Sequence, residues 1–231
     1  MVNLVSIIIP VRNQADHIRT VVEEFEQSLA RLPAPHELLI VVNASTDATW
    51  DICRELEKEH AAVRAIHSDK GGWGLAVKLG LEAARGELLC YTNCARTRAE
   101  DLMLLLIYAL AYPNVVIKAN RKIRDGWLRR LGSLLYNLEC RALFDLSFWD
   151  INGTPKVFPR GFDKLLRLTQ DGDLIDVEFN IICRRESYPV LEVPIFSSRR
   201  YGGRSTTTIL SAWKMYSGAI RLWRKLRKTS S

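Results

Sequence analysis

Val5-Ser6-Ile7-Ile8-Ile9-Pro10 is the stretch that decides the fold class. β-branched residues dominate it and a proline ends it, which is typical of a strand that is buried on both faces of a parallel sheet. Apolar residues then recur at helical spacing over residues 16–32. We therefore expect the chain to begin with a β-strand followed by an α-helix.

Strands and helices alternate in the same way as far as residue 119. We expect further strands at 37–42, 63–66, 88–91 and 115–119. Three further helices are expected: one that ends near residue 60, one at 75–84 and one at 101–111. Before the first of these helices, Ser45 and Asp47 are expected to be its caps. Strands that alternate with helices of about 10–15 residues indicate βαβ units. The pattern predicts an α/β fold with a mostly parallel central sheet flanked by helices.

The alternation breaks beyond residue 120. A basic loop precedes an expected helix at 127–144, and two short strands are expected near 156–158 and 190–195. Between those strands, the run LIDVEFNII fits either a half-buried strand or a helix. No repeat or low-complexity linker is found. We therefore assign residues 1–206 to one domain and residues 207–231 to a basic tail.

The tail has the pattern of an amphipathic helix over residues 209–228, where apolar residues recur mostly at steps of three and four among basic ones. Such a helix either lies in an anionic membrane interface, which we favour, or docks on the domain. A second stripe follows the basic loop and consists of Leu128, Leu131, Leu135 and Leu138. It is open to two interpretations, lipid contact and ordinary core packing.

Charge is distributed unevenly along the 231 residues. The formal net charge is +7, but residues 1–115 carry 11 Lys/Arg and 15 Asp/Glu, whereas residues 116–231 carry 22 and 11. An anionic partner of the C-terminal half is therefore expected: phosphates, nucleic acid or an anionic membrane. Nucleic acid is disfavoured because no recognised binding module is evident. Phosphate-binding loops of nucleotidases and dinucleotide-binding oxidoreductases are excluded because their glycine motifs are missing.

Cysteine usage and the absence of long apolar runs predict a cytoplasmic location. The five cysteines form no CxxC pair, which indicates reduced thiols. The longest apolar stretch, residues 102–112, is shorter than the ~20 residues that a membrane-spanning helix needs. The first residues lack the basic region of a secretion signal.

Ligands of open α/β sheets bind beyond the C-terminal ends of the strands, so the residues that follow each apolar run are the candidate site. They are Pro10, Arg12, Asn13, Asn43, Gly72, Gly74, Thr92, Asn93 and Cys94. A lone G-x-G is a weak signal, and it is more often a turn into a helix.

Several segments in order resemble family 2 glycosyltransferases of the GT-A (nucleotide-diphospho-sugar transferase) fold, and most of all the branch of dolichyl-phosphate mannose synthases and polyprenyl-phosphate glycosyltransferases. They are VSIIIPVRN, IVVNASTDAT, GGWGLAVKLGLEAARGE, YTNCA, IKANRKIRDGWLRRLGSLLYN, DINGTPKVFPR and LEVPIFSSRRYGGRST. The resemblance covers residues 4–206. It implies a nucleotide-sugar donor held by the candidate site above and a lipid phosphate as acceptor.

The acidic residues of that family are missing here. Where members carry two aspartates after the second strand, this chain has Val42 and Asn43. Where they carry the Asp-x-Asp motif that holds Mg²⁺ or Mn²⁺, this chain has Thr92, Asn93 and Cys94. Hard cations bind mainly carboxylate oxygens and water. We therefore expect no protein-bound metal at this position, although the family implies one.

Cations of the chain offer a substitute for the metal. We expect Arg121, Arg130 and Arg200 to stabilise the leaving pyrophosphate, since fixed guanidinium groups can neutralise developing charge. Lys122, Arg124 and Ser133 are the candidates for the acceptor phosphate. A lipid phosphate is already ionised and needs no general base. The expected protein is a glycosyltransferase peripheral at the cytoplasmic membrane face, with a homo-oligomer or a membrane-protein partner left open. The alternative is a catalytically inert relative that binds a nucleotide, a lipid phosphate or a protein.

Overall fold

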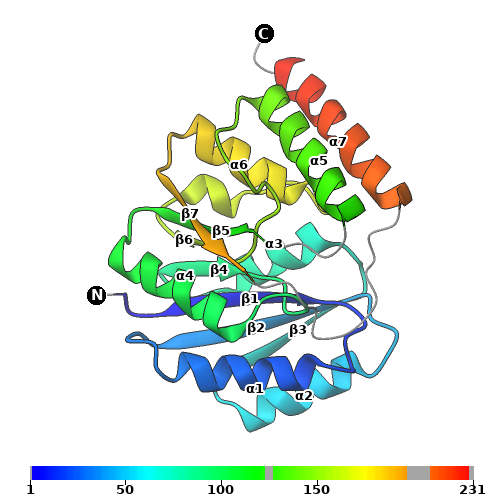
Figure 1. The fold of residues 1–231 in the computed structure, drawn as a ribbon. Helices are drawn as coiled ribbons and strands as arrows, with labels where there is room; N and C mark the ends of the chain where they lie inside the picture. Colours follow the sequence, from blue (N-terminus) through cyan, green and yellow to red (C-terminus); the bar gives the residue numbers. More distant parts are fainter. Residues whose placement is uncertain (1, 123–126, 197–208, 229–231) are drawn as a thin grey trace.

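The computed structural model describes residues 2–122, 127–196 and 209–228 (Figure 1). Within these residues one sheet has the strand order β3-β2-β1-β4-β6-β5-β7. The strands are β1 (Val5–Val11), β2 (His36–Asn43), β3 (Val63–Ser68), β4 (Leu88–Tyr91), β5 (Val116–Arg121), β6 (Lys156–Pro159) and β7 (Val190–Ile195). All pairings are parallel except those of β6, which runs antiparallel to both β4 and β5.

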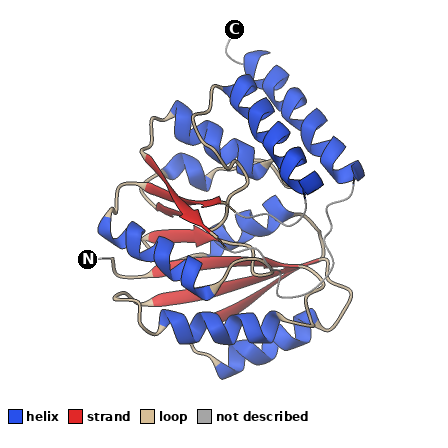
Figure 2. Cartoon of the chain, in the orientation of Figure 1, coloured by secondary structure: helices blue, strands red, loops and turns tan. Residues whose placement is uncertain are grey.

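Helices cover both faces of the sheet and give three layers (Figure 2). They are α1 (Ile18–Leu29), α2 (Thr49–Glu59), α3 (Trp73–Ala83), α4 (Ala99–Ala111), α5 (Trp127–Phe144), α6 (Ile175–Arg185) and α7 (Ile209–Lys228), with a 3₁₀ turn at Asp163–Leu166. The apolar faces of α1, α2 and α4 share one buried cluster with the sheet, and those of α3, α5, α6 and α7 share the other. Each face of the sheet therefore has its own hydrophobic core.

The α/β architecture and the mostly parallel sheet are confirmed. Every residue of β1 is buried, as its β-branched composition indicates for a strand covered on both faces. The observed boundaries lie close to those expected from the sequence. The ambiguous run LIDVEFNII forms the start of α6, where nearly all residues from Ile175 to Ile181 are buried. Burial all round a helix erases the one-sided periodicity that would have identified it.

The prediction that Ser45 and Asp47 cap α2 is wrong. The N-cap position is Ala48, which makes no side-chain capping hydrogen bond. Asp47 instead accepts hydrogen bonds from the backbone N–H groups of Thr49 (3.1 Å) and Ala15 (3.2 Å). Ser45 accepts one from the N–H of Asn13 at 3.0 Å. Both side chains therefore tie the loop after β1 to the loop after β2.

The tail forms the expected helix, α7, and its apolar face packs on the domain. Ala219 and Leu222 are buried, and the Tyr216 hydroxyl donates to the Gly132 carbonyl of α5 at 2.6 Å. The rings of Tyr216 and Tyr136 meet edge to face. Docking on the domain is therefore the interpretation that fits α7. None of the described helices combines the length and the apolar composition needed to cross a bilayer.

Candidate functional site

The candidate site lies at the edge of the sheet where the parallel strands end, and Asn43 holds three of its loops together. The side-chain amide of Asn43 donates to the Val11 carbonyl at 2.9 Å, and its oxygen accepts the N–H of Gly72 at 3.1 Å. These contacts join the ends of β1 and β2 to the loop before α3. Asn43 is buried, so its role in the described structure is to fix the shape of this edge.

The residues after β1 divide into structural and exposed ones. Pro10 is buried inside β1, and Asn13 adopts φ 51°. The Asn13 side chain accepts the N–H of Thr46 at 2.8 Å, which again connects the first two loops. Arg12 is exposed, and its guanidinium lies beside Gly71 in the loop after β3. Arg12 is therefore a cation at this end of the site that solvent or an anion can reach.

Gly72 and Gly74 are required by close packing of the chain against itself. A Cβ atom at Gly72 would lie 2.4 Å from the Asp171 carbonyl oxygen, and one at Gly74 would lie 2.2 Å from that of Gln170. The N–H of Leu75 donates to the Asp171 carbonyl at 2.9 Å. The glycines thus let the start of α3 approach the loop that precedes α6.

Thr92, Asn93 and Cys94 follow β4, and each side chain already has a hydrogen-bond partner within the protein. Thr92 pairs with the hydroxyl of Thr97 at 2.7 Å, and the Cys94 thiol donates to the Gln14 side chain at 2.5 Å. The Asn93 side-chain oxygen accepts the N–H of Ala95 at 3.1 Å.

These neutral groups do not fit a divalent cation, which prefers carboxylate oxygens. In the part of the chain that the structure describes, no cluster of three His, Cys, Asp or Glu could hold a metal ion. The residues after β4 therefore do not match the divalent cation that the family resemblance implies.

Arg121 at the end of β5 forms a bidentate ion pair with the buried carboxylate of Asp150. Its Nε and Nη2 atoms lie 2.8 and 2.9 Å from the two Asp150 oxygens, and its backbone N–H donates to the same carboxylate at 3.1 Å. Burial acts to lower the pKa of Arg121, but the charge and hydrogen bonds of Asp150, together with the charge of Asp176, outweigh it and the pKa is raised. The guanidinium is therefore a fixed, permanently charged group on a side chain that is about a quarter exposed (26%).

Glu192 on β7 positions the loop that carries Asp150. Its carboxylate accepts the backbone N–H groups of Trp149 (2.9 Å) and Asp150 (3.2 Å). It also lies 3.3 Å from the ammonium group of Lys118. A continuous series of polar contacts therefore links the middle of β5 to Arg121 at its end.

Two buried lysines, which the sequence did not identify as site candidates, lie behind the Arg121–Asp150 pair. Lys118 and Lys156 are fully buried and face each other in the register of β5 and β6. Lys156 forms an ion pair with Asp176 at the start of α6, and the Tyr91 hydroxyl donates to the same carboxylate at 2.9 Å. Lys118 donates to the Asn180 side chain at 2.8 Å.

Burial dominates the protonation of this cluster. It lowers the pKa of Lys118 to about 8, helped by the neighbouring charge of Lys156 and opposed by Glu192. It also lowers the pKa of Lys156, against the attraction of Asp176. The pKa of the Tyr91 hydroxyl is raised well above its usual value, first by burial and then by Asp176. Tyr91 therefore remains protonated and serves as a hydrogen-bond donor.

Among the described residues, no hydrogen bond or ion pair joins the remaining predicted residues to Arg121. Arg130 is exposed on α5, Ser133 is half-buried on the same helix, and Lys122 is exposed directly after β5. Arg124 and Arg200 lie outside the described residues. Their assignment to phosphate binding stays a prediction.

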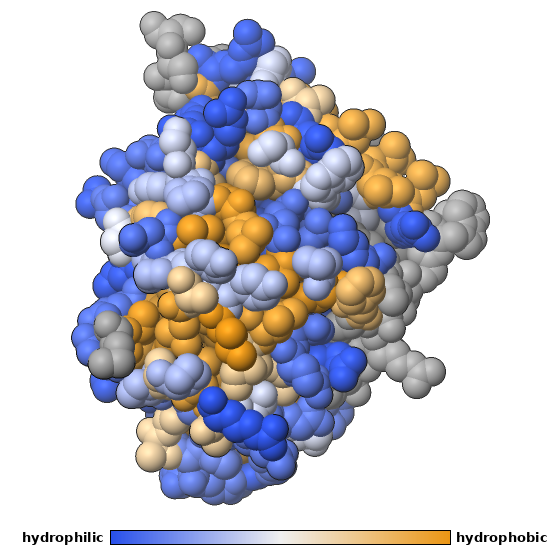
Figure 3. All heavy atoms as spheres, turned by 60° about the vertical axis from the view of Figure 1, so that its left-hand side comes forward, coloured by the Kyte–Doolittle hydropathy of each residue, from blue (hydrophilic) through white to orange (hydrophobic). Residues whose placement is uncertain are grey.

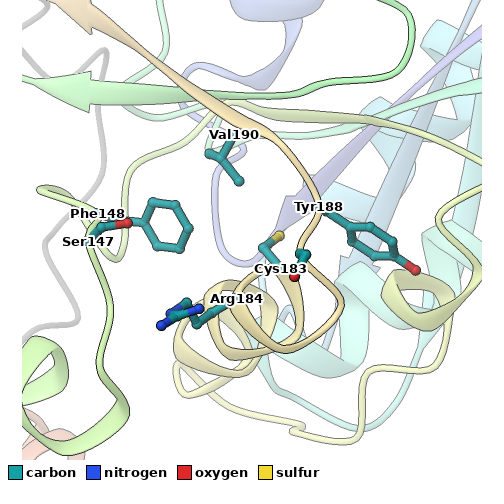
Figure 4. A pocket seen from close by; sticks show the side chains of 7 residues that line it. Ser147, Phe148, Cys183, Arg184, Tyr188 and Val190 are labelled. Carbon is teal, nitrogen blue, oxygen red and sulfur yellow. The ribbon is translucent and has the colours of Figure 1, made fainter.

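A cavity of about 290 Å³ lies at the opposite edge of the sheet, where β7 begins (Figure 4). Phe148, Cys183, Tyr188 and Val190 line it, together with Arg184, which is paired with Asp145 at 2.6 Å. Burial raises the pKa of the Cys183 thiol to about 12. The thiol is therefore unreactive at neutral pH, and this cavity is separate from the candidate site.

The fold and the polar edge of the sheet define the class of nucleotide-diphospho-sugar transferase-like α/β proteins, and two solved structures agree. Mannosyl-3-phosphoglycerate synthase from Rubrobacter xylanophilus superposes with a TM-score of 0.74 at 18% identity, over 99% of this chain and 75% of that one. Glucosyl-3-phosphoglycerate synthase from Mycobacterium tuberculosis, in complex with Mn²⁺, UDP and phosphoglyceric acid, gives 0.70 at 16% identity, over 94% and 76%. The expected GT-A fold is confirmed.

The family profile of Glycosyl transferase family 2 matches residues 6–188, and the chain belongs to this family. Among curated relatives, undecaprenyl-phosphate 4-deoxy-4-formamido-L-arabinose transferase from Proteus mirabilis is 23% identical over 90% of this chain and 64% of the relative. The protein of the same name from Aeromonas hydrophila is 21% identical over 88% and 63%. This chain thus spans slightly less than two thirds of these relatives.

Proposed function

We propose that the protein transfers a sugar from a nucleotide-sugar donor to a polyprenyl phosphate. The observation that carries the proposal is the alignment of about nine tenths of the chain with relatives named undecaprenyl-phosphate sugar transferases. Membership of Glycosyl transferase family 2 supports the same reaction class. The donor would bind at the edge formed by the loops after β1, β2, β3 and β4, with Arg12 available for its pyrophosphate.

Arg121 would supply positive charge that a metal ion supplies in other enzymes. Nε and Nη2 are held by Asp150, while Nη1 makes no hydrogen bond within the described residues and is free to face a phosphate oxygen. A guanidinium held in place before the reaction needs no reorganisation when the leaving group becomes charged. The acceptor phosphate is an anion at neutral pH, so attack on the sugar requires no carboxylate base near Thr92–Cys94.

The protein would work at the cytoplasmic face of an anionic membrane, because a polyprenyl phosphate is anchored in the bilayer by its chain. Excess positive charge in the C-terminal half supports this location.

Thermal-shift measurements with a panel of nucleotide-sugars, each with Mg²⁺ or with EDTA, test the donor proposal. We expect one nucleotide-sugar to stabilise the protein equally in both conditions. With that donor, the protein should transfer labelled sugar to undecaprenyl phosphate. Stabilisation that requires the metal would contradict the metal-free site. No response to any nucleotide-sugar would instead favour the inert alternative. The loss of acidic residues at two family positions is the observation that supports this alternative.

A further inference from the structure

α5 carries an exposed row of leucines. Leu131, Leu134, Leu135 and Leu138, the leucine face, have exposed fractions of 47%, 58%, 51% and 63%. Their spacing of three, one and three places them on one side of the helix. Figure 3 shows hydrophobic residues gathered in a patch at the upper right, over α5. Contiguous apolar patches on soluble proteins mark sites of protein or membrane contact.

Trp149 extends the leucine face beyond the end of α5. It is 65% exposed, and the guanidinium of Arg141 on α5 lies 4.4 Å from the centre of its ring. A tryptophan stacked with an arginine combines apolar surface with positive charge. Side chains of this kind favour the boundary between the headgroups and the acyl chains of a bilayer.

The helices that carry this surface are strongly basic. Together α5 and α7 contain nine Lys/Arg and one carboxylate, Glu139, so that the pair alone is more positive than the whole protein at +7. Arg130, Arg221 and Arg224 are among the exposed cations. The two helices lie side by side at the outside of the molecule (Figure 1). Exposed apolar side chains on a strongly positive helix pair complement an anionic lipid surface.

We infer that the leucine face, with the cations of α5 and α7 around it, is the surface by which the protein lies on an anionic lipid bilayer. The leucines and Trp149 enter the upper acyl region, and the cations contact headgroup phosphates. α7 contributes charge rather than insertion, because its own apolar face is already packed on the domain. A second copy fits this surface poorly, since a two-fold dimer would bring two strongly positive helix pairs together.

This orientation suits the proposed reaction. α5 begins only six residues after Arg121 in the sequence. The inference deepens the membrane location in the proposed function, but lipid binding can be measured without any sugar transfer. The two proposals can therefore fail separately.

Vesicle co-sedimentation of the full chain tests the inference. The test variant is Leu134→Ser with Leu138→Ser, and the matched control is Leu104→Ser with Ile107→Ser on α4, where both residues are also exposed. Vesicles of phosphatidylcholine with phosphatidylglycerol are compared with vesicles of phosphatidylcholine alone. We expect the test variant to bind the anionic vesicles on the order of tenfold to hundredfold more weakly than the parent, from the lost apolar burial. The control should bind as the parent does.

Charge is tested with Arg221→Gln and Arg224→Gln, which should reduce the preference for phosphatidylglycerol and its sensitivity to salt. Equal binding by the parent and the leucine variant would overturn the inference, as would equal loss in the α4 control or no vesicle binding by the parent. A dimer of the parent in light scattering that the leucine substitutions dissociate, without any lipid binding, would assign the face to a second copy instead.

Discussion

The two halves of the sheet keep their sites in place by different means. In the half formed by β1–β4 and α1–α4, hydrogen bonds of Asn43 and Asn13 and of the exposed Asp47 join the loops. Among the described residues of this half, Glu37 is the one buried carboxylate. In the half formed by β5–β7 and α5–α7, two lysines and two aspartates are buried together. The first half depends on close packing and the second on charge balance. Substitutions and changes of pH should therefore affect the two halves differently.

Two Asp–Lys ion pairs, one buried and one exposed, give the largest expected contrast in stability. Asp176→Ala leaves the buried Lys156 without its partner and should lower the free energy of unfolding by about 3–5 kcal/mol. Asp171→Ala removes the partner of Lys78, and Asp171 is 69% exposed, so the expected loss is below about 1 kcal/mol. Urea unfolding of both variants measures the difference. Similar losses would show that the buried pair is not strongly coupled.

Arg121→Gln should reduce kcat by about 10²–10³ if the guanidinium stabilises the leaving group. Arg121→Lys should recover part of the rate, because it keeps the charge without the bidentate contact to Asp150. Arg19→Gln is the control: this half-buried arginine of α1 pairs with Glu59, outside the candidate site, and its loss should leave kcat unchanged. Thermal unfolding of each variant separates activity from stability. Transfer at the parental rate by Arg121→Gln would refute the assignment.

Two glycines measure how closely the chain is packed in each half. Gly74→Ala would place a Cβ atom against the Gln170 carbonyl, and we expect a loss of about 2–3 kcal/mol in unfolding free energy together with weaker donor binding. Gly132→Ala in α5 meets no atom within 4 Å and should stabilise the helix by about 0.5–1 kcal/mol. Denaturant midpoints of the two variants should thus shift in opposite directions. A neutral Gly74→Ala variant would show that the loop before α6 can move away.

Lys118 should give the smallest effect, and one that depends on pH. Its pKa is about 8 in the folded protein and near 10.5 when unfolded, so between these values the unfolded chain binds more protons and this group's contribution to stability rises with pH. The slope approaches about 1.4 kcal/mol per pH unit. The Lys118→Met variant lacks this pH-dependent contribution to stability. The stability of the parent minus that of the variant, measured in urea at pH 7, 8 and 9, should therefore increase with pH, and a constant difference would contradict the lowered pKa.

The sequence predicted the elements of the β1 half well, because each leaves a local pattern. The continuous apolar run of β1 and the four buried residues of β4 could be placed from composition alone. The candidate site residues after these strands followed from the rule for open sheets. What their side chains do could not be predicted: Thr92 and Cys94 were candidates for ligand contact, and both are hydrogen-bonded within the protein.

The β5 half was harder to predict because its important contacts join distant residues. Lys118 and Lys156 meet only because β6 pairs with β5, and a strand register has no signature in either strand by itself. Asp150 pairs with Arg121, which lies 29 positions earlier in the sequence. The spacing of the leucines in α5 indicated an apolar side of a helix but not what covers it. Its exposure could be recognised only once α7 had been placed.

The antiparallel strand β6 imposes an order on assembly. Strands β1 to β4 pair with one another and are complete once Tyr91 has been synthesised, whereas β4 and β5 share no hydrogen bonds because β6 lies between them. The free edge of β4 therefore remains unpaired during synthesis until residues 92–159 have emerged from the ribosome. An unpaired strand edge is a template for wrong pairing. The nascent chain is thus most vulnerable to aggregation after the first half of the sheet has formed and before Lys156 arrives to close it.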